Sequence, residues 1–135
     1  MEARFKKAAI VDDDHIYVYG AKRAMQKIDF AKEVLVYSNG KEALDGLSYI
    51  IEKNDELPDV LFLDLNMPVL DGWQFLDEFS LLNPNKEMII YIVTSSINPD
   101  DQERAKQYSL NGKYVVKPIT MKKLVALFGI DKDSM

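Results

Sequence analysis

Five short apolar runs, each followed by a segment with helical periodicity, constrain the fold of this chain more than any other feature of its sequence. The runs occupy residues 8–11, 34–37, 60–63, 88–93 and 114–116. They are rich in Val, Ile, Leu and Tyr, and they are continuously apolar instead of alternating with polar residues. This pattern is typical of parallel strands that are covered on both faces.

Helical patterns fill the segments after these runs, and several begin at residues that cap helices well. The predicted helices span residues 14–28, 41–53, 72–82, 100–110 and 120–128. Asp14 or Asp13 is placed to cap the first, Asn98-Pro99 opens the fourth, and Thr120 caps the last. The chain therefore contains five βα units in succession, which predicts an α/β fold with a parallel sheet and right-handed crossovers.

The composition indicates a single globular domain and excludes some classes of protein, but it does not indicate a function. A chain of 135 residues suits one domain, and 47% hydrophobic with 29% charged residues is ordinary for a globular protein. The absence of cysteine fits a reducing compartment. The net charge of −5 argues against a nucleic-acid-binding face, and no apolar run is long enough to span a membrane. The N-terminal residues do not form a signal peptide, so we expect a cytoplasmic protein.

Reactive or ionisable side chains follow four of the five predicted strands directly. Asp12 and Asp13 follow the first strand, Asp64 the third and Lys117 the fifth, while Thr94 ends the fourth. In an open parallel sheet the carboxyl ends of the strands share one edge, and ligands bind in the crevice there. We therefore expect these five residues to converge on one site.

Three carboxylates at one site repel one another strongly. Two unit charges about 4 Å apart cost roughly 4 kcal/mol at an effective dielectric constant near 20. Protons or a cation must relieve this repulsion. Because the chain has no cysteine and one histidine, a zinc or copper site is not expected, and hard carboxylate oxygens favour Mg²⁺. With Asp64 as nucleophile, and Lys117 and Thr94 contacting phosphate oxygens, the set predicts phosphoryl transfer.

Four motifs in order carry a family resemblance that covers nearly the whole chain. They are IVDDD (residues 10–14), LFLDLNMPVLDGW (61–73), IVTSS (92–96) and YVVKP (114–118). Together they resemble the receiver domains of response regulators in two-component signalling, in particular the stand-alone receivers of the chemotaxis-regulator type. The resemblance implies a doubly wound (βα)5 sheet with the flavodoxin-like strand order 2-1-3-4-5.

The resemblance also assigns the acceptor and the metal ligands. It implies that Asp64 accepts a phosphoryl group from a histidine kinase or a histidine phosphotransfer protein. Asp13 would bind Mg²⁺ directly, Asp12 would act largely through water, and Asp64 would be a further ligand. Asn66 would contribute its backbone carbonyl to the metal.

The remaining motif residues match the family's switch. Thr94 corresponds to the switch hydroxyl, Lys117 to the phosphate-binding lysine and Tyr114 to the aromatic switch residue. The resemblance implies that phosphate draws Thr94 inward and that Tyr114 follows, which remodels the face formed by the fourth helix, fifth strand and fifth helix. It also implies a cis Lys117-Pro118 peptide bond.

Only 17 residues follow Pro118, so we expect residues 1–135 to be a single receiver domain without an output domain. Its output would then be contact with an unknown downstream protein, as a monomer or weak homodimer. Such a receiver catalyses only its own phosphorylation and dephosphorylation, so we class it as a signalling switch and not as an enzyme.

Three alternatives stay open. The first is a receiver-fold module that binds proteins without phosphorylation, against which the complete motif set argues. The second is a phosphatase of the haloacid dehalogenase type, whose second aspartate is replaced here by Asn66. The third is an FMN binder, which lacks a phosphate loop after the first strand. Three neighbours receive structural roles: Asp14 as an exposed N-cap, His15 as a helix-start residue and Trp73 as a packing residue.

Overall fold

The computed structural model describes residues 3–130 except residues 83, 85 and 111. Its strands form one five-stranded parallel sheet with the order β2-β1-β3-β4-β5. The strands are β1 (Phe5–Val11), β2 (Ala31–Tyr37), β3 (Val60–Leu63), β4 (Ile89–Thr94) and β5 (Tyr114–Val116). The predicted fold class and the predicted strand order 2-1-3-4-5 are both confirmed.

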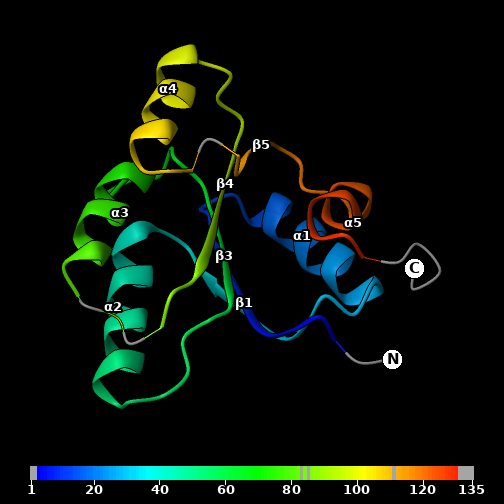
Figure 1. Cartoon of the computed structure of the whole chain (residues 1–135), viewed down its shortest axis with the longest axis horizontal. Coiled ribbons are helices and arrows are strands. Elements are labelled where there is room, and N and C mark those ends of the chain that lie inside the picture. Colours follow the sequence, from blue (N-terminus) through cyan, green and yellow to red (C-terminus); the bar gives the residue numbers. More distant parts are fainter. Residues whose placement is uncertain (1–2, 83, 85, 111, 131–135) are drawn as a thin grey trace.

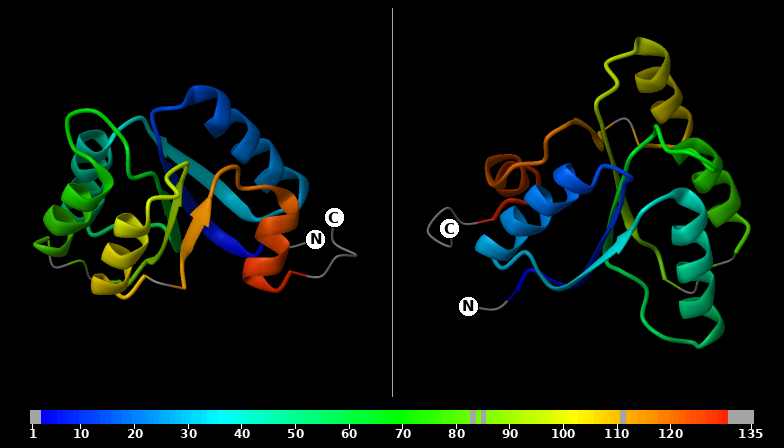
Figure 2. Two further views of the ribbon diagram at one scale, coloured as in Figure 1. Left: turned by 90° about the horizontal axis from the view of Figure 1, so that it is seen from above. Right: turned by 180° about the vertical axis from the view of Figure 1, so that it is seen from behind.

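The helices cover both faces of this sheet. They are α1 (His15–Lys27), α2 (Gly40–Glu52), α3 (Gly72–Ser80), α4 (Pro99–Gln107) and α5 (Met121–Phe128). Helices α1 and α5 lie together on one face, and α2, α3 and α4 cover the other (Figure 1). The view from behind in Figure 2 shows the same two layers. No helix among the described residues combines the length and apolar character needed to cross a membrane.

Consecutive residues of the central strands supply two separate cores. In β3, Phe62 packs in the core under α1 and α5, whereas its neighbours Leu61 and Leu63 pack in the core under α2, α3 and α4. Successive side chains of a strand point to opposite faces, so a strand covered on both sides must be apolar at every position. This requirement explains the unbroken apolar runs in the sequence.

Strand boundaries differ from the sequence predictions where charged residues occupy a paired strand. The first strand was predicted from residue 8, but it begins at Phe5, because the backbone of residues 5–7 pairs with the start of β2. Lys6 and Lys7 interrupt the apolar run at this end of the sheet.

The fourth helix ends at Gln107, three residues earlier than predicted, and Ser109 beyond it has a positive φ of 59°.

Helix capping follows the sequence closely. The predicted N-caps Asp14 and Thr120 accept hydrogen bonds from backbone N–H groups in the first turns of α1 and α5. Asn98, from the predicted start signal of the fourth helix, caps α4 in the same way. Asp71 forms a capping box with Gln74 at the start of α3. These caps fix the helix starts that follow β1, β3, β4 and β5, which are the strands whose ends carry the predicted site residues.

Candidate functional site

The site residues are held by backbone hydrogen bonds that continue the sheet beyond its strands. The Asp64 N–H donates to the Val11 carbonyl at 3.0 Å, and the Lys117 N–H donates to the Thr94 carbonyl at 2.8 Å. The Asp12 N–H likewise donates to the last residue of β2 at 3.0 Å. The backbone of these residues is therefore as well fixed as that of the strands.

Three aspartates meet at this edge, as predicted. Asp12, Asp13 and Asp64 each place a carboxylate oxygen within 4.8 Å of the others. Asp12 and Asp64 are buried, with 2% and 4% of their surface exposed, whereas Asp13 is exposed. We call these three carboxylates, two buried and one open to solvent, the acidic pocket.

The Lys117 ammonium lies between the two buried carboxylates. Its Nζ is 2.8 Å from Asp12 Oδ2 and 3.4 Å from Asp64 Oδ2, and the side chain is 14% exposed. Burial alone would lower the pKa of Lys117, but the two carboxylates outweigh burial and raise that pKa. The lysine is therefore firmly cationic. The Lys117-Pro118 peptide bond is cis, in agreement with the family resemblance.

The pKa of Asp12 is raised, chiefly because the carboxyl is buried. Its burial raises the pKa of the carboxyl, and the charge of Asp64 raises it further. The Lys117 ammonium and the Asp14 backbone N–H, which donates to Asp12 Oδ1 at 2.9 Å, lower the pKa but do not cancel the effect of burial. The net effect is that the pKa of Asp12 is raised although Lys117 lies beside it.

The residues next to the acidic pair have the structural roles expected of them. Asp14 is exposed and caps α1, accepting hydrogen bonds from the N–H groups of Ile16 and Tyr17 at 3.1 Å. His15 is the exposed first residue of α1. Neither side chain belongs to the group of three carboxylates.

The start of α3 lies close to the backbone of Asp64 and Leu65. Gly72, the first residue of α3, donates its N–H to the Leu65 carbonyl at 3.0 Å. A Cβ at Gly72 would lie 2.6 Å from the Asp64 carbonyl oxygen and 2.9 Å from Leu65 Cα, so only glycine fits without backbone movement. The intervening loop contains Asn66, whose side chain is exposed, and its role as a carbonyl ligand stays a prediction.

The two proposed switch residues contact the same loop residue from different strands. Thr94 is fully buried, and its Oγ1 accepts a long hydrogen bond of 3.3 Å from the Ser96 N–H. Tyr114, which is half-buried, donates from its hydroxyl to the Ser96 carbonyl at 3.0 Å. A movement of Thr94 would therefore act on the β4–α4 loop. The switch roles themselves stay predictions.

A hydrogen-bonded connection from this loop to α3 was not foreseen from the sequence. Ser96 Oγ donates to Asp101 Oδ2 at 2.7 Å, and Trp73 Nε1 donates to Asp101 Oδ1 at 3.2 Å. Trp73 is 4% exposed, so its predicted packing role is confirmed, and its ring also stacks on Tyr108. Only its polar contact was missed, because it depends on how α3 and α4 lie against each other.

A second missed residue touches the lysine. The Tyr17 ring lies under Lys117 Nζ, 4.6 Å from its centroid. The helical spacing of Tyr17, Val18 and Ala21 could have placed Tyr17 on the inner face of α1. Its contact with Lys117 depends on the tertiary packing of α1 against the segment after β5.

Comparison with known proteins agrees with this geometry. The family model for the response regulator receiver domain matches residues 8–128. The chain is 27% identical over 115 residues to the probable methanogenesis regulatory protein FilR2 of Methanothrix harundinacea, a match that covers 85% of this chain and 74% of FilR2. It is 28% identical over 120 residues to the transcriptional regulatory protein PrrA of Mycobacterium tuberculosis, covering 89% of this chain and 47% of PrrA.

A solved structure supports the fold independently. The crystal structure of a two-component response regulator from Cytophaga hutchinsonii matches with a TM-score of 0.82 and 24% identity, covering 96% of both chains. At this identity the likeness shows the shared fold alone. The chain spans less than half the length of PrrA, so the match covers only part of that protein.

Proposed function

The chain belongs to the response regulator receiver domain family, and we propose that it accepts a phosphoryl group on Asp64 in a Mg²⁺-dependent reaction. The proposed donor is a histidine kinase or a histidine phosphotransfer protein. One observation carries the proposal: three aspartate carboxylates lie within 4.8 Å of one another, with Lys117 Nζ at 2.8 Å and 3.4 Å from the two that are buried.

The donor set of the pocket fits a hard divalent cation. Its oxygens are carboxylate oxygens, the ligand type that Mg²⁺ prefers, and the chain has no cysteine to favour a softer metal. Three carboxylates within 4.8 Å of one another leave the site with more negative charge than the single Lys117 ammonium can balance, which supports a bound cation. Asp12, Asp13 and Asp64 would hold the ion, with the Asn66 carbonyl as a further ligand. When bound, Mg²⁺ would neutralise charge on the transferring phosphoryl oxygens.

Each protein group has a definable part in the transfer. One Asp64 carboxylate oxygen attacks phosphorus, a new P–O bond forms, and the bond from phosphorus to the donor breaks with its electron pair leaving on the donor. Asp64 Oδ1 accepts the Leu65 N–H at 2.8 Å, which orients the carboxylate and leaves Oδ2 facing Lys117. Lys117 would then bind a phosphoryl oxygen, because its ammonium already lies at the nucleophile.

Phosphorylation would be read out through the Ser96 backbone. The Thr94 hydroxyl could donate a charge-assisted hydrogen bond to a phosphoryl oxygen on Asp64. That bond would be stronger than the 3.3 Å hydrogen bond that Thr94 Oγ1 accepts from the Ser96 N–H. Movement of Thr94 would release the hydrogen bond of the Ser96 N–H, while Tyr114 holds the Ser96 carbonyl. The α4–β5–α5 face would then change its affinity for a protein target.

The competing proposal is a receiver-fold module that binds proteins without phosphorylation. Intact mass spectrometry after incubation with acetyl phosphate, with and without Mg²⁺, separates the two. We expect one added phosphoryl group with Mg²⁺ and none in Asp64→Asn. Asp14→Asn is the matched control, because it removes an acidic charge from the same loop while Asn still caps α1. A wild-type protein that gains no mass under any of these conditions would support the competing proposal.

A further inference from the structure

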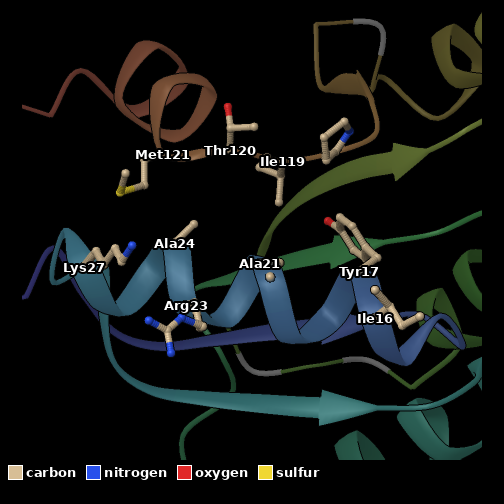
Figure 3. A pocket seen from close by; sticks show the side chains of 11 residues that line it. Ile16, Tyr17, Ala21, Arg23, Ala24, Lys27, Ile119, Thr120 and Met121 are labelled. Carbon is tan, nitrogen blue, oxygen red and sulfur yellow. The ribbon is translucent and has the colours of Figure 1, made fainter.

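Tyr17 lies at the junction between the acidic pocket and a groove on the surface. It belongs to the first turn of α1, and its ring lies under Lys117 Nζ with 4.6 Å between the nitrogen and the ring centroid. It also lines a groove of about 480 Å³ between α1 and the segment that leads into α5. Figure 3 shows its side chain rising from α1 toward the segment that carries Ile119. Tyr17 therefore belongs both to the lining of the groove and to the surroundings of the ammonium.

The ring completes the surroundings of the Lys117 ammonium. An ammonium has three N–H donors. Asp64 Oδ2 accepts one of them at 3.4 Å, and Asp12 Oδ2 lies 2.8 Å from the nitrogen as an ion-pair partner. The Tyr17 ring lies within cation–π distance on a further side, and the lysine side chain is only 14% exposed. The ring is thus a third close partner of the ammonium, beside the two carboxylates.

The hydroxyl of Tyr17 does not explain why a tyrosine is here. Its oxygen is buried and has no hydrogen-bond partner among the residues that the structure describes. Burial raises the pKa of Tyr17, and the charges of Asp12, Asp64 and Asp14 raise it further, so the phenol stays neutral. The contact with Lys117 is made by the ring and not by the hydroxyl.

The contact between the Tyr17 ring and Lys117 matters most when Asp12 and Asp64 bind a cation. In the free protein, Asp12 and Asp64 hold Lys117 by charge. Once these two carboxylates bind a cation, their attraction for the ammonium weakens. The attraction between the ammonium and the ring does not depend on the carboxylates. The ring is therefore the partner that remains to hold Lys117 at the nucleophile.

We propose that Tyr17 is a positioning residue that holds the Lys117 ammonium against the phosphoryl-accepting site through its aromatic ring. This inference rests on the proposed function, since Lys117 must first be a phosphate-binding group. Phosphoryl transfer depends chiefly on the placement of such charges, so loss of the ring should slow phosphorylation without unfolding the domain.

The test compares the rate of phosphorylation by acetyl phosphate at saturating Mg²⁺ in four proteins: wild type, Tyr17→Phe, Tyr17→Leu and Tyr19→Leu. Tyr17→Leu should lower the rate about 3- to 10-fold, the range that one partly desolvated cation–π contact supports. Tyr17→Phe should restore the wild-type rate because it keeps the ring. Tyr19 is on the same helix but 65% exposed, so its replacement by Leu is a matched control and should not change the rate.

A second readout is independent of the reaction. A methylene group beside a ring face has NMR signals shifted upfield, so the Lys117 ε-CH2 signals should be shifted in wild type and in Tyr17→Phe. They should return to the ordinary lysine position in Tyr17→Leu. Lys117→Arg identifies the signals by removing them.

The outcomes distinguish failure of this inference from failure of the proposed function. A wild-type protein that is never phosphorylated overturns the proposed function and this inference with it. A wild-type protein that is phosphorylated, together with a folded Tyr17→Leu that reacts at the same rate, overturns the inference alone. A Tyr17→Phe as slow as Tyr17→Leu also overturns it, because the hydroxyl would then matter. If Tyr17→Leu does not fold, unshifted Lys117 ε-CH2 signals in wild type are the contradicting result.

Discussion

Removing the charge of Asp13 should stabilise the metal-free protein and weaken its response to Mg²⁺. One carboxylate oxygen each of Asp12, Asp13 and Asp64 lies within 4.8 Å of the others. Asp13 is exposed, so the dielectric constant of water applies, and two unit charges at this separation repel by about 0.9 kcal/mol. Asp13→Asn removes two such pairs, and the attraction of Lys117 for Asp13 offsets part of the gain. We expect a net stabilisation of about 1 kcal/mol.

Thermal unfolding monitored by circular dichroism measures this effect. For a domain of this size, 1 kcal/mol corresponds to a rise in melting temperature of about 3–4 °C. Wild type should gain about 2.7 kcal/mol when Mg²⁺ is at a hundred times its dissociation constant, and Asp13→Asn should gain far less at the same concentration. The two proteins should therefore change their order of stability when Mg²⁺ is added.

Asp45→Asn is the matched control for this experiment. Asp45 is an exposed aspartate on α2 whose carboxylate pairs with Lys41 at 3.0 Å. Its replacement should cost at most about 0.5 kcal/mol and should leave the response to Mg²⁺ unchanged. If metal-free Asp13→Asn melts at or below the temperature of wild type, the crowding of carboxylates does not destabilise the pocket and the argument for a cation fails.

Two further predictions concern the stability of the domain: one tests the hydrogen bonds of Asp59, the other the space around two helix glycines. Burial alone would raise the pKa of Asp59, but hydrogen bonds from Lys86 and from two backbone N–H groups of β1 outweigh it and lower that pKa. Asp59→Asn should therefore cost roughly 1–2 kcal/mol in urea denaturation at pH 7, and this cost should shrink as the pH falls below the ordinary value of 3.8; a cost that persists at low pH would refute it. Gly72→Ala should destabilise the domain by about 1–3 kcal/mol in thermal denaturation, because its Cβ meets the Asp64 backbone, whereas Gly20→Ala on open helix surface should stabilise it by about 0.5–1 kcal/mol. Equal effects at the two glycines would contradict the close approach.

The parts of the fold that depend on local pattern were predictable. The strand residues 8–11 and 60–63 are buried on both faces of the sheet, so every one of them is apolar and the run is visible in the sequence. The capping residues are equally local, since a side chain and the first turn of its own helix suffice. The extension of β1 to Phe5 was not predictable in this way, because it depends on pairing with β2 and not on burial.

The same distinction applies to the site. Asp12, Asp64 and Lys117 each follow a strand, and the parallel sheet brings the ends of its strands together, so topology alone predicts their meeting. The Tyr17 ring reaches Lys117 only through the packing of α1 against the segment after β5. The contact of Trp73 with α4 likewise depends on how two helices lie against each other. Contacts that depend on packing leave no fixed spacing in the sequence.

Locating the phosphoryl group within the chain tests the central claim most directly. Reduction of an aspartyl phosphate by borohydride converts that aspartate to homoserine, which peptide mass spectrometry locates. After incubation with acetyl phosphate and Mg²⁺, we expect homoserine at position 64 alone, and none when Mg²⁺ is chelated. Homoserine at Asp12 or Asp13, a phosphoryl group on His15, or equal labelling without Mg²⁺ would contradict the account.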